Sequence, residues 1–203
     1  FSGSIVSGSV APGDAIKVLP SGKTSTIERV VTYGGDLAKG VAGQSLTVTF
    51  RDEIDVSRGD VICAANAPVE VSDQFQVDIL WMDEEAMLPG RSYVIKAGTR
   101  QVPGTIETIR HKVNVNTMEH VAAKTLTLNE IGVCNLELDS SIAFTTYAEN
   151  RHLGSFIIID RFTNSTVGMG LIHFALRRAS NIHWQAMDVN KVSRAGQAKQ
   201  KPT

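Results

Sequence analysis

VSGSVAPGDAIKVLPSG, residues 6–22, is the stretch of sequence that predicts the fold most directly. Within it, PGD at residues 12–14 is a turn signal, and AIKVL at residues 15–19 is a short run of β-forming residues with one polar break at Lys17. PSG at residues 20–22 then marks a second turn. The stretch therefore predicts a strand, a turn, another strand and another turn, which is the pattern of a small all-β unit.

The Gly-Asp turn occurs a second time, as SRGD at residues 57–60, again before a strand-like run. Gly13 and Gly59 can adopt a positive φ at no steric cost, and the Asp that follows each glycine can hydrogen bond to the turn backbone. The two turns frame one β unit, which we expect to span residues 1–67. Pro68 then marks the joint to the next unit.

Residues 68–178 are expected to form a second β unit, followed by a flexible tail at residues 179–203. The second unit holds several short runs of alternating apolar and polar residues, at 75–81, 92–96, 105–115, 132–138, 155–159 and 165–176. Many short strands at close spacing predict barrels or sandwiches. The scarcity of helical periodicity excludes a layered α/β fold with a parallel sheet. The fold class predicted here is all-β.

Motifs in both units resemble the elongation-factor-Tu-like GTPases. The first unit resembles their second domain through GGDL at 34–37, AGQSLTV at 42–48 and EIDVSRGDVI at 53–62. The second unit resembles the third domain of one branch, the large GTPase subunit of sulfate adenylyltransferase, through AANAPVEVSDQF at 64–75, LPGRSY at 88–93, NVNTMEH at 114–120, LNEIG at 128–132 and YAENR at 147–151. This resemblance covers about residues 1–178 and implies two consecutive antiparallel β-barrels of the translation-factor type.

The resemblance also implies a non-catalytic role in sulfate activation. In that branch, a catalytic subunit makes adenylylsulfate and pyrophosphate from ATP and sulfate, coupled to GTP hydrolysis by the GTPase subunit. The resemblance implies a GTPase domain ahead of Phe1, and GTP and magnesium would bind there. The barrels would dock on that domain and on the catalytic subunit, so no catalytic, cofactor-binding or metal-binding residue is predicted within the chain.

Charge separates the body of the chain from its tail. Residues 1–176 hold 14 Lys and Arg against 20 Asp and Glu, a net charge of −6, whereas residues 177–203 hold six basic residues against Asp188, a net charge of +5. NIHWQ at residues 181–185 resembles the segment ahead of adenylylsulfate kinase domains, which some chains carry fused behind this subunit. A fused kinase domain is therefore a further partner that the resemblance suggests.

An acidic body argues against nucleic acid as a partner, because phosphate backbones are bound through many Lys and Arg contacts. One alternative stays open: similar barrels of translation elongation factors hold aminoacyl-tRNA, and charges could cluster in three dimensions. No apolar run approaches the roughly 20 residues that a membrane span needs, so we expect no membrane association. The N-terminus also lacks a basic-then-apolar signal layout, so we expect a cytoplasmic protein. Cys63 and Cys134 are the only cysteines and lie far apart, so no disulfide or zinc framework is predicted.

Three groups of residues resemble functional sites, and each has a structural interpretation that we favour. SGKT at residues 21–24 resembles the end of a phosphate-binding loop, but Lys17 stands where that loop needs its first glycine, so a hairpin turn is predicted. The acidic run at residues 83–85 is expected to be a solvated hairpin. His111 and His120 could converge if a turn joins their strands, yet no histidine has the spacing of a metal motif.

Overall fold

The computed structural model describes residues 1–176, which contain strands and turns but no helix. The tail predicted at residues 179–203, with its NIHWQ segment, lies outside the described residues. Eight strands belong to the first part of the chain: β1 (Ser2–Ser4), β2 (Ser9–Val10), β3 (Ala15–Leu19), β4 (Thr24–Thr32), β5 (Gly35–Asp36), β6 (Gly40–Val41), β7 (Ser45–Phe50) and β8 (Val61–Ala64). Seven belong to the second: β9 (Glu70–Trp81), β10 (Ser92–Ala97), β11 (Arg100–Val113), β12 (His120–Val121), β13 (Ile131–Phe144), β14 (Ser155–Ile159) and β15 (Thr166–Ala175).

The first barrel is built from an antiparallel sheet in the order β1-β7-β4-β3-β8, with β5 paired to β4 and a separate β2-β6 ladder. The ladder approaches the sheet closely at Gly40, where a Cβ atom would lie 2.4 Å from the Leu46 side chain. A larger residue there would require the Leu46 side chain to shift. The core of this barrel consists of Ile16, Val18, Ile27, Val30, Leu46 and Val48.

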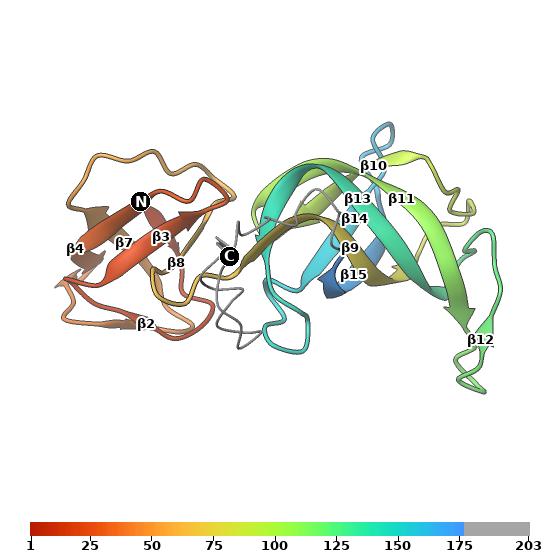
Figure 1. The fold of residues 1–203 in the computed structure, drawn as a ribbon, viewed down its shortest axis with the longest axis horizontal. Coiled ribbons are helices and arrows are strands. Elements are labelled where there is room, and N and C mark those ends of the chain that lie inside the picture. Colours follow the sequence, from red (N-terminus) through yellow and green to blue (C-terminus); the bar gives the residue numbers. More distant parts are fainter. Residues whose placement is uncertain (177–203) are drawn as a thin grey trace, which may run out of the picture.

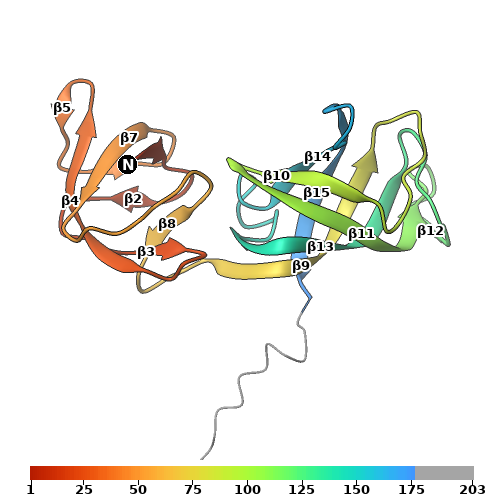
Figure 2. The ribbon, with the colours of Figure 1, turned by 90° about the horizontal axis from the view of Figure 1, so that it is seen from above.

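The second barrel is closed. Its strands follow the order β10-β14-β15-β9-β13-β11, and β11 pairs again with β10, so that six antiparallel strands form a ring (Figure 2). β12 extends β11 as a short hairpin arm beyond the ring. Closure leaves no free edge among the six strands, which removes a site for unwanted strand pairing.

Buried and partly exposed residues alternate along β9 with a period of two, as the sequence predicts. Phe75, Val77, Ile79 and Trp81 are at most 2% exposed, whereas the residues between them are only partly buried. Since successive side chains of a strand point to opposite faces, every second residue enters the barrel. Trp81 packs edge-to-face on Tyr93 at 5.7 Å between ring centroids, within the core of the barrel.

The two barrels lie side by side, and β9 runs from the first into the second (Figures 1 and 2). The second barrel therefore has a near end, facing the first barrel, and a far end. The near end carries the β10-β11 turn and the loop at residues 145–154, and the far end carries the loops at residues 82–91, 114–130 and 160–165. That the chain divides into domains at residues 67 and 68 stays a prediction. Among residues 1–176, no helix could cross a membrane.

Candidate functional site

The two Gly-Asp turns have the same local chemistry but different surroundings. In the first turn, the Asp14 carboxylate accepts a hydrogen bond from the Ala11 amide at 2.8 Å. In the second, the Asp60 carboxylate accepts one from the Ser57 amide at 2.9 Å, and it also contacts the Arg100 guanidinium at 3.4 Å. Arg100 is the first residue of β11, so the second turn joins the first barrel to the near end of the second.

This inter-barrel contact is close enough to depend on a glycine. A Cβ atom on Gly59 would lie 2.9 Å from the Arg100 Cα atom, which is backbone and cannot swing aside. A second contact lies elsewhere on the near end, where the Asn150 side-chain amide donates to the Val6 carbonyl at 3.5 Å. The two contacts support a fixed placement of the barrels.

The SGKT segment at residues 21–24 is a hairpin turn between β3 and β4, as predicted. The Gly22 amide donates to the Val18 carbonyl at 2.7 Å, and the Val18 amide donates to the Lys23 carbonyl at 2.8 Å. The Lys23 ammonium lies 3.5 Å from the Asp55 carboxylate. A phosphate loop needs a helix after its lysine, so that amide groups surround the anion, whereas β4 follows here.

We expect no specific binding of GTP, GDP or ATP to this chain in isothermal titration calorimetry at physiological salt. The reason is that Lys23 faces a carboxylate and the turn amides are used within the hairpin. Lys23→Ala serves as the control, because it should leave the titration unchanged. Micromolar binding of a nucleotide that disappears in Lys23→Ala would contradict the hairpin interpretation.

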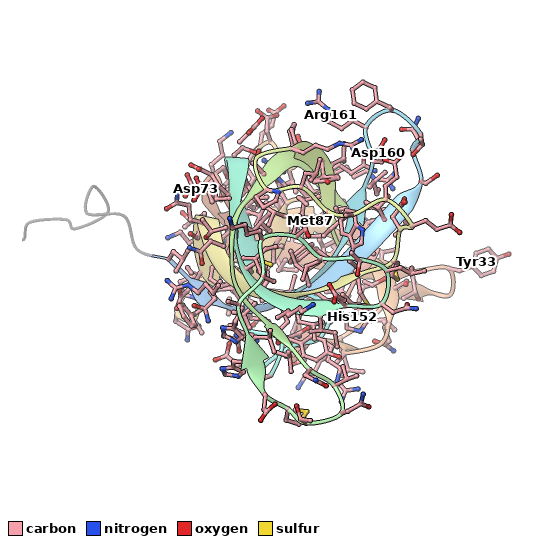
Figure 3. All side chains as sticks on the ribbon, turned by 90° about the vertical axis from the view of Figure 1, so that its right-hand side faces the viewer. Tyr33, Asp73, Met87, His152, Asp160 and Arg161 are labelled. Carbon is pink, nitrogen blue, oxygen red and sulfur yellow. The ribbon has the colours of Figure 1, made fainter. Side chains whose placement is uncertain are left out.

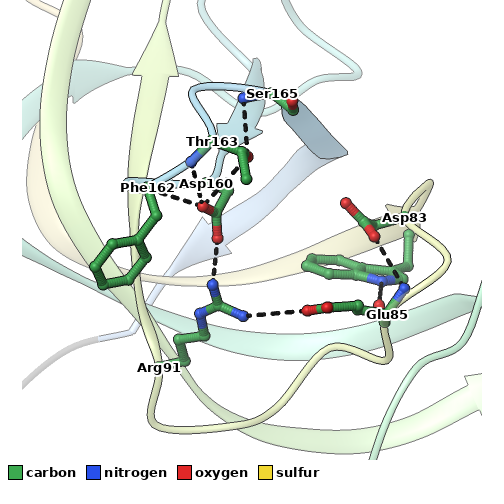
Figure 4. A network of polar contacts seen from close by, with 8 residues as sticks. Asp83, Glu85, Arg91, Asp160, Phe162, Thr163 and Ser165 are labelled. Carbon is green, nitrogen blue, oxygen red and sulfur yellow. Dashed lines mark hydrogen bonds and ion pairs between the residues drawn. The ribbon is translucent and has the colours of Figure 1, made fainter.

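At the far end, Asp160 forms the centre of a polar network that connects two loops (Figure 4). Its carboxylate accepts hydrogen bonds from the amides of Phe162 and Thr163 at 2.8 and 2.9 Å, and it forms an ion pair with the Arg91 guanidinium. The Asp160 side chain is only 7% exposed. Because a buried carboxylate needs such partners, the network fixes the 160–165 loop against the 82–91 loop.

The same contacts keep Asp160 ionised. The amides of Thr163 and Phe162, together with the Arg91 charge, hold the pKa of the Asp160 carboxyl below its ordinary value, although burial alone would raise it. A carboxyl whose pKa is lower in the folded state stabilises the fold above its unfolded pKa, and this contribution is lost as the pH falls through the folded pKa. The network therefore weakens only in acid.

The acidic run at residues 83–85 belongs to the same region, and it is partly ordered by hydrogen bonds. The Asp83 carboxylate accepts from the Glu85 amide at 2.9 Å, and the Trp81 indole donates to the Glu85 carbonyl at 2.7 Å. The Glu85 carboxylate lies 4.0 Å from the Arg91 guanidinium. The Asp83 carboxylate thus caps the turn of the 82–91 loop, and the Glu85 carboxylate approaches the Arg91 guanidinium. Both carboxylates therefore have a structural role.

His111 and His120 do converge, as the sequence allowed. Their rings stack at 3.9 Å between centroids, because β12 pairs with β11 and places both side chains on one face of the hairpin. Elsewhere, the His173 ring lies 2.6 Å from the Asp78 carboxylate on the barrel exterior. Within residues 1–176, no group of three His, Cys, Asp or Glu side chains is placed to bind a metal ion.

Comparison with known proteins shows which proteins the chain resembles in sequence. Residues 74–173 match the model of GTP-eEF1A C-terminal domain-like proteins. The bifunctional enzyme NodQ of Rhizobium sp. strain N33 is 50% identical over 202 residues, which is 100% of this chain and 31% of that protein. Sulfate adenylyltransferase subunit 1 of Aeromonas hydrophila is 43% identical over 209 residues, which covers 94% of this chain and 44% of that subunit. The chain is a homologue of sulfate adenylyltransferase subunit 1.

A second kind of bifunctional enzyme is also similar to the chain. The bifunctional enzyme CysN/CysC of Xylella fastidiosa is 49% identical over 195 residues, which is 96% of this chain and 31% of that enzyme. The chain thus spans less than half the length of these relatives. In fold, it is similar to Sup35 complexed with GDP, with a TM-score of 0.79 and 19% identity over 87% of this chain and 44% of that one.

These findings confirm the predicted family and the all-β fold of translation-factor type. Sequence reasoning missed the residues that connect loops far apart in the chain. Arg91 and Asp160 are 69 positions apart, and Asp60 and Arg100 are 40 positions apart. Arg91 lies in the RSY segment at residues 91–93, which is part of the family resemblance. No local pattern in a single sequence, however, identifies Asp160 as the residue that pairs with Arg91.

Proposed function

We propose that this chain is the barrel region of the GTPase subunit of sulfate adenylyltransferase. The observation that carries the proposal is the match to sulfate adenylyltransferase subunit 1 over 94% of the chain, together with matches to bifunctional relatives. The enzyme would convert ATP and sulfate to adenylylsulfate and pyrophosphate, coupled to GTP hydrolysis, in the cytoplasm. GTP and magnesium would bind to a GTPase domain that this chain does not contain.

In this proposal, the barrels supply binding surfaces, while the bonds are made and broken elsewhere. They would dock on the GTPase domain and on the catalytic subunit, and convey the nucleotide state as a rigid-body rearrangement. Such a role requires that the barrels keep their relative placement. The contacts from Asp60 to Arg100 and from Asn150 to Val6 support this requirement.

The alternative function is tRNA binding by the barrels of a translation elongation factor. The likeness to Sup35 concerns the fold alone, at 19% identity, and so does not favour either function. Charge argues for the sulfate-activating enzyme, because residues 1–176 carry a net charge of −6. Two cations at the far end of the second barrel are also used in ion pairs, Arg91 with Asp160 and Lys112 with Glu130, so their charges are partly neutralised for a phosphate backbone.

The two functions are separated by a co-elution experiment. The purified chain is mixed in turn with the GTPase domain, with the sulfate adenylyltransferase catalytic subunit and with aminoacyl-tRNA, at physiological salt. We expect co-elution with a protein partner and none with tRNA, because tRNA affinity needs clustered cations and falls steeply with salt. Truncation after Leu176 removes the basic tail and serves as the control for nonspecific RNA binding. Retention of tRNA with neither protein bound would support the translation factor instead.

A further inference from the structure

The far end of the second barrel exposes an unusual number of large apolar side chains. Figure 3 views this end of the molecule, with Asp160 and Arg161 at its rim. Half of the exposed large hydrophobic residues of the described chain belong to its three loops: Met82 at 39%, Leu88 at 53%, Val115 at 60%, Met118 at 71%, Val121 at 39%, Leu128 at 45% and Phe162 at 85%. Soluble monomers rarely gather such side chains in one region, and where they do, the region is often an interface.

The loops that carry these side chains are fixed to one another. The Met87 amide donates to the Leu126 carbonyl at 2.8 Å, which joins the 82–91 loop to the 114–130 loop. The Arg91 to Asp160 ion pair joins the first of these loops to the 160–165 loop. A surface that is already ordered loses little conformational entropy on binding, so its apolar area can contribute more to affinity.

The backbone of one of these loops is strained. Only three non-glycine residues among residues 1–176 have a positive φ, and all three belong to the 114–130 and 160–165 loops: Met118 at 60°, Asn129 at 64° and Asn164 at 56°. Asparagine tolerates this conformation, but for Met118 it costs about 1–2 kcal/mol. Strain of this kind persists only where the surrounding structure fixes the backbone, and it is concentrated at functional sites.

The charges of the far end fit a protein partner better than a polyanion. The Lys112 ammonium lies 2.6 Å from the Glu130 carboxylate, and Arg91 is paired with Asp160. The three loops together hold six Asp and Glu against three Lys and Arg, a net charge of −3, which would repel a polyanion. Apolar side chains next to a polar, charged rim are typical of a protein–protein interface.

The position of the chain ends points to a separate polypeptide as that partner. Phe1 stacks on Phe50 in the first barrel at 4.9 Å between ring centroids, and Ala175 pairs with Phe75 toward the near end. Both ends of the described chain therefore lie away from the far end (Figure 1). We propose that the far end of the second barrel is the docking surface for the sulfate adenylyltransferase catalytic subunit, an inference that rests on the function proposed above.

Serine substitutions at Phe162 and Met118 test this surface. The affinity of the 203-residue chain for the catalytic subunit is measured by biolayer interferometry. We expect each substitution to weaken binding about tenfold or more, because aromatic and Met side chains are enriched at protein–protein interfaces and a few such residues carry most of the binding energy. Tyr33→Ser and Phe174→Ser are the matched controls, since these side chains are also exposed, at 110% and 49%, but lie away from the far end. The controls should stay within about twofold of the parent chain. All four variants should keep the parent melting temperature.

The outcomes separate this inference from the proposed function. If the parent chain does not bind the catalytic subunit at all, the docking role fails and the surface assignment fails with it. If the parent chain binds and Phe162→Ser and Met118→Ser bind equally well, the docking role stands and the far end is the wrong surface. The assignment is also wrong if these variants only abolish self-association of the chain in light scattering, because the far end then binds a second copy.

Discussion

Replacing Phe75 by alanine is expected to destabilise the second barrel by about 3–5 kcal/mol and to leave the first barrel folded. The Phe75 side chain is 0% exposed and packs edge-to-face on Phe144 at 4.9 Å between ring centroids. Its removal leaves a cavity that the closed ring of six strands cannot fill without breaking its pairing. The first barrel has a separate core, which Phe75 does not enter.

The two cysteines report on the two barrels separately. Cys134 lies in the second barrel, where burial raises the pKa of its thiol to about 12, so it should react with a thiol reagent only after that barrel opens. Cys63, in β8 of the first barrel, is partly exposed. Pulse labelling across a urea gradient, followed by mass spectrometry, should show the Cys134 transition shifted to lower urea and the Cys63 profile unchanged.

Phe174→Ala is the matched control for Phe75→Ala, because it removes the same side chain from the same barrel at a position that is 49% exposed. Its transition should move by much less. A joint shift of both cysteine profiles in Phe75→Ala would mean that the barrels unfold as one cooperative unit. The division at residues 67 and 68 would then be wrong.

The features that could be predicted from the sequence are the local ones. Alternation at residues 75–81 follows from the pleat of a strand and needs no knowledge of the rest of the chain. The turns at residues 12–14 and 57–60 follow from the conformational freedom of glycine and the hydrogen bonds of aspartate. The structure confirms each of these predictions, because short-range sterics decide them.

Features that depend on long-range contacts could not be predicted in this way. The β10-β11 pairing closes the second barrel, but alternation alone fits an open sandwich equally well. His111 and His120 became a pair only once the β11-β12 register was known. The exposed side chains at the far end, such as Phe162, look like core residues in a sequence, since apolar character says nothing about which residues stay outside.

We expect the placement of the two barrels to depend on Gly59. This residue has a φ of 99°, and a side chain there would meet the backbone of Arg100 at 2.9 Å. We expect Gly59→Val to force the 57–60 turn away from β11 and to break the contact between Asp60 and Arg100. Overpacking of this kind costs about 1–3 kcal/mol, and each 1.4 kcal/mol is a factor of about ten in the population of separated barrels.

Gly13→Val is the control that isolates this contact, because Gly13 has a similar φ of 93° but a Cβ atom added there would meet no atom within 4 Å. Both variants carry the backbone strain of a valine at positive φ, and only Gly59→Val adds the collision with the second barrel. Proteinase K should therefore cut the connection at residues 64–70 about tenfold faster in Gly59→Val than in Gly13→Val, as mapped by mass spectrometry. Equal cleavage in the two variants would mean that the turn does not hold the barrels together. The rigid-body transmission proposed for them would then need another contact, since a change at one barrel reaches the other only while their relative placement is fixed.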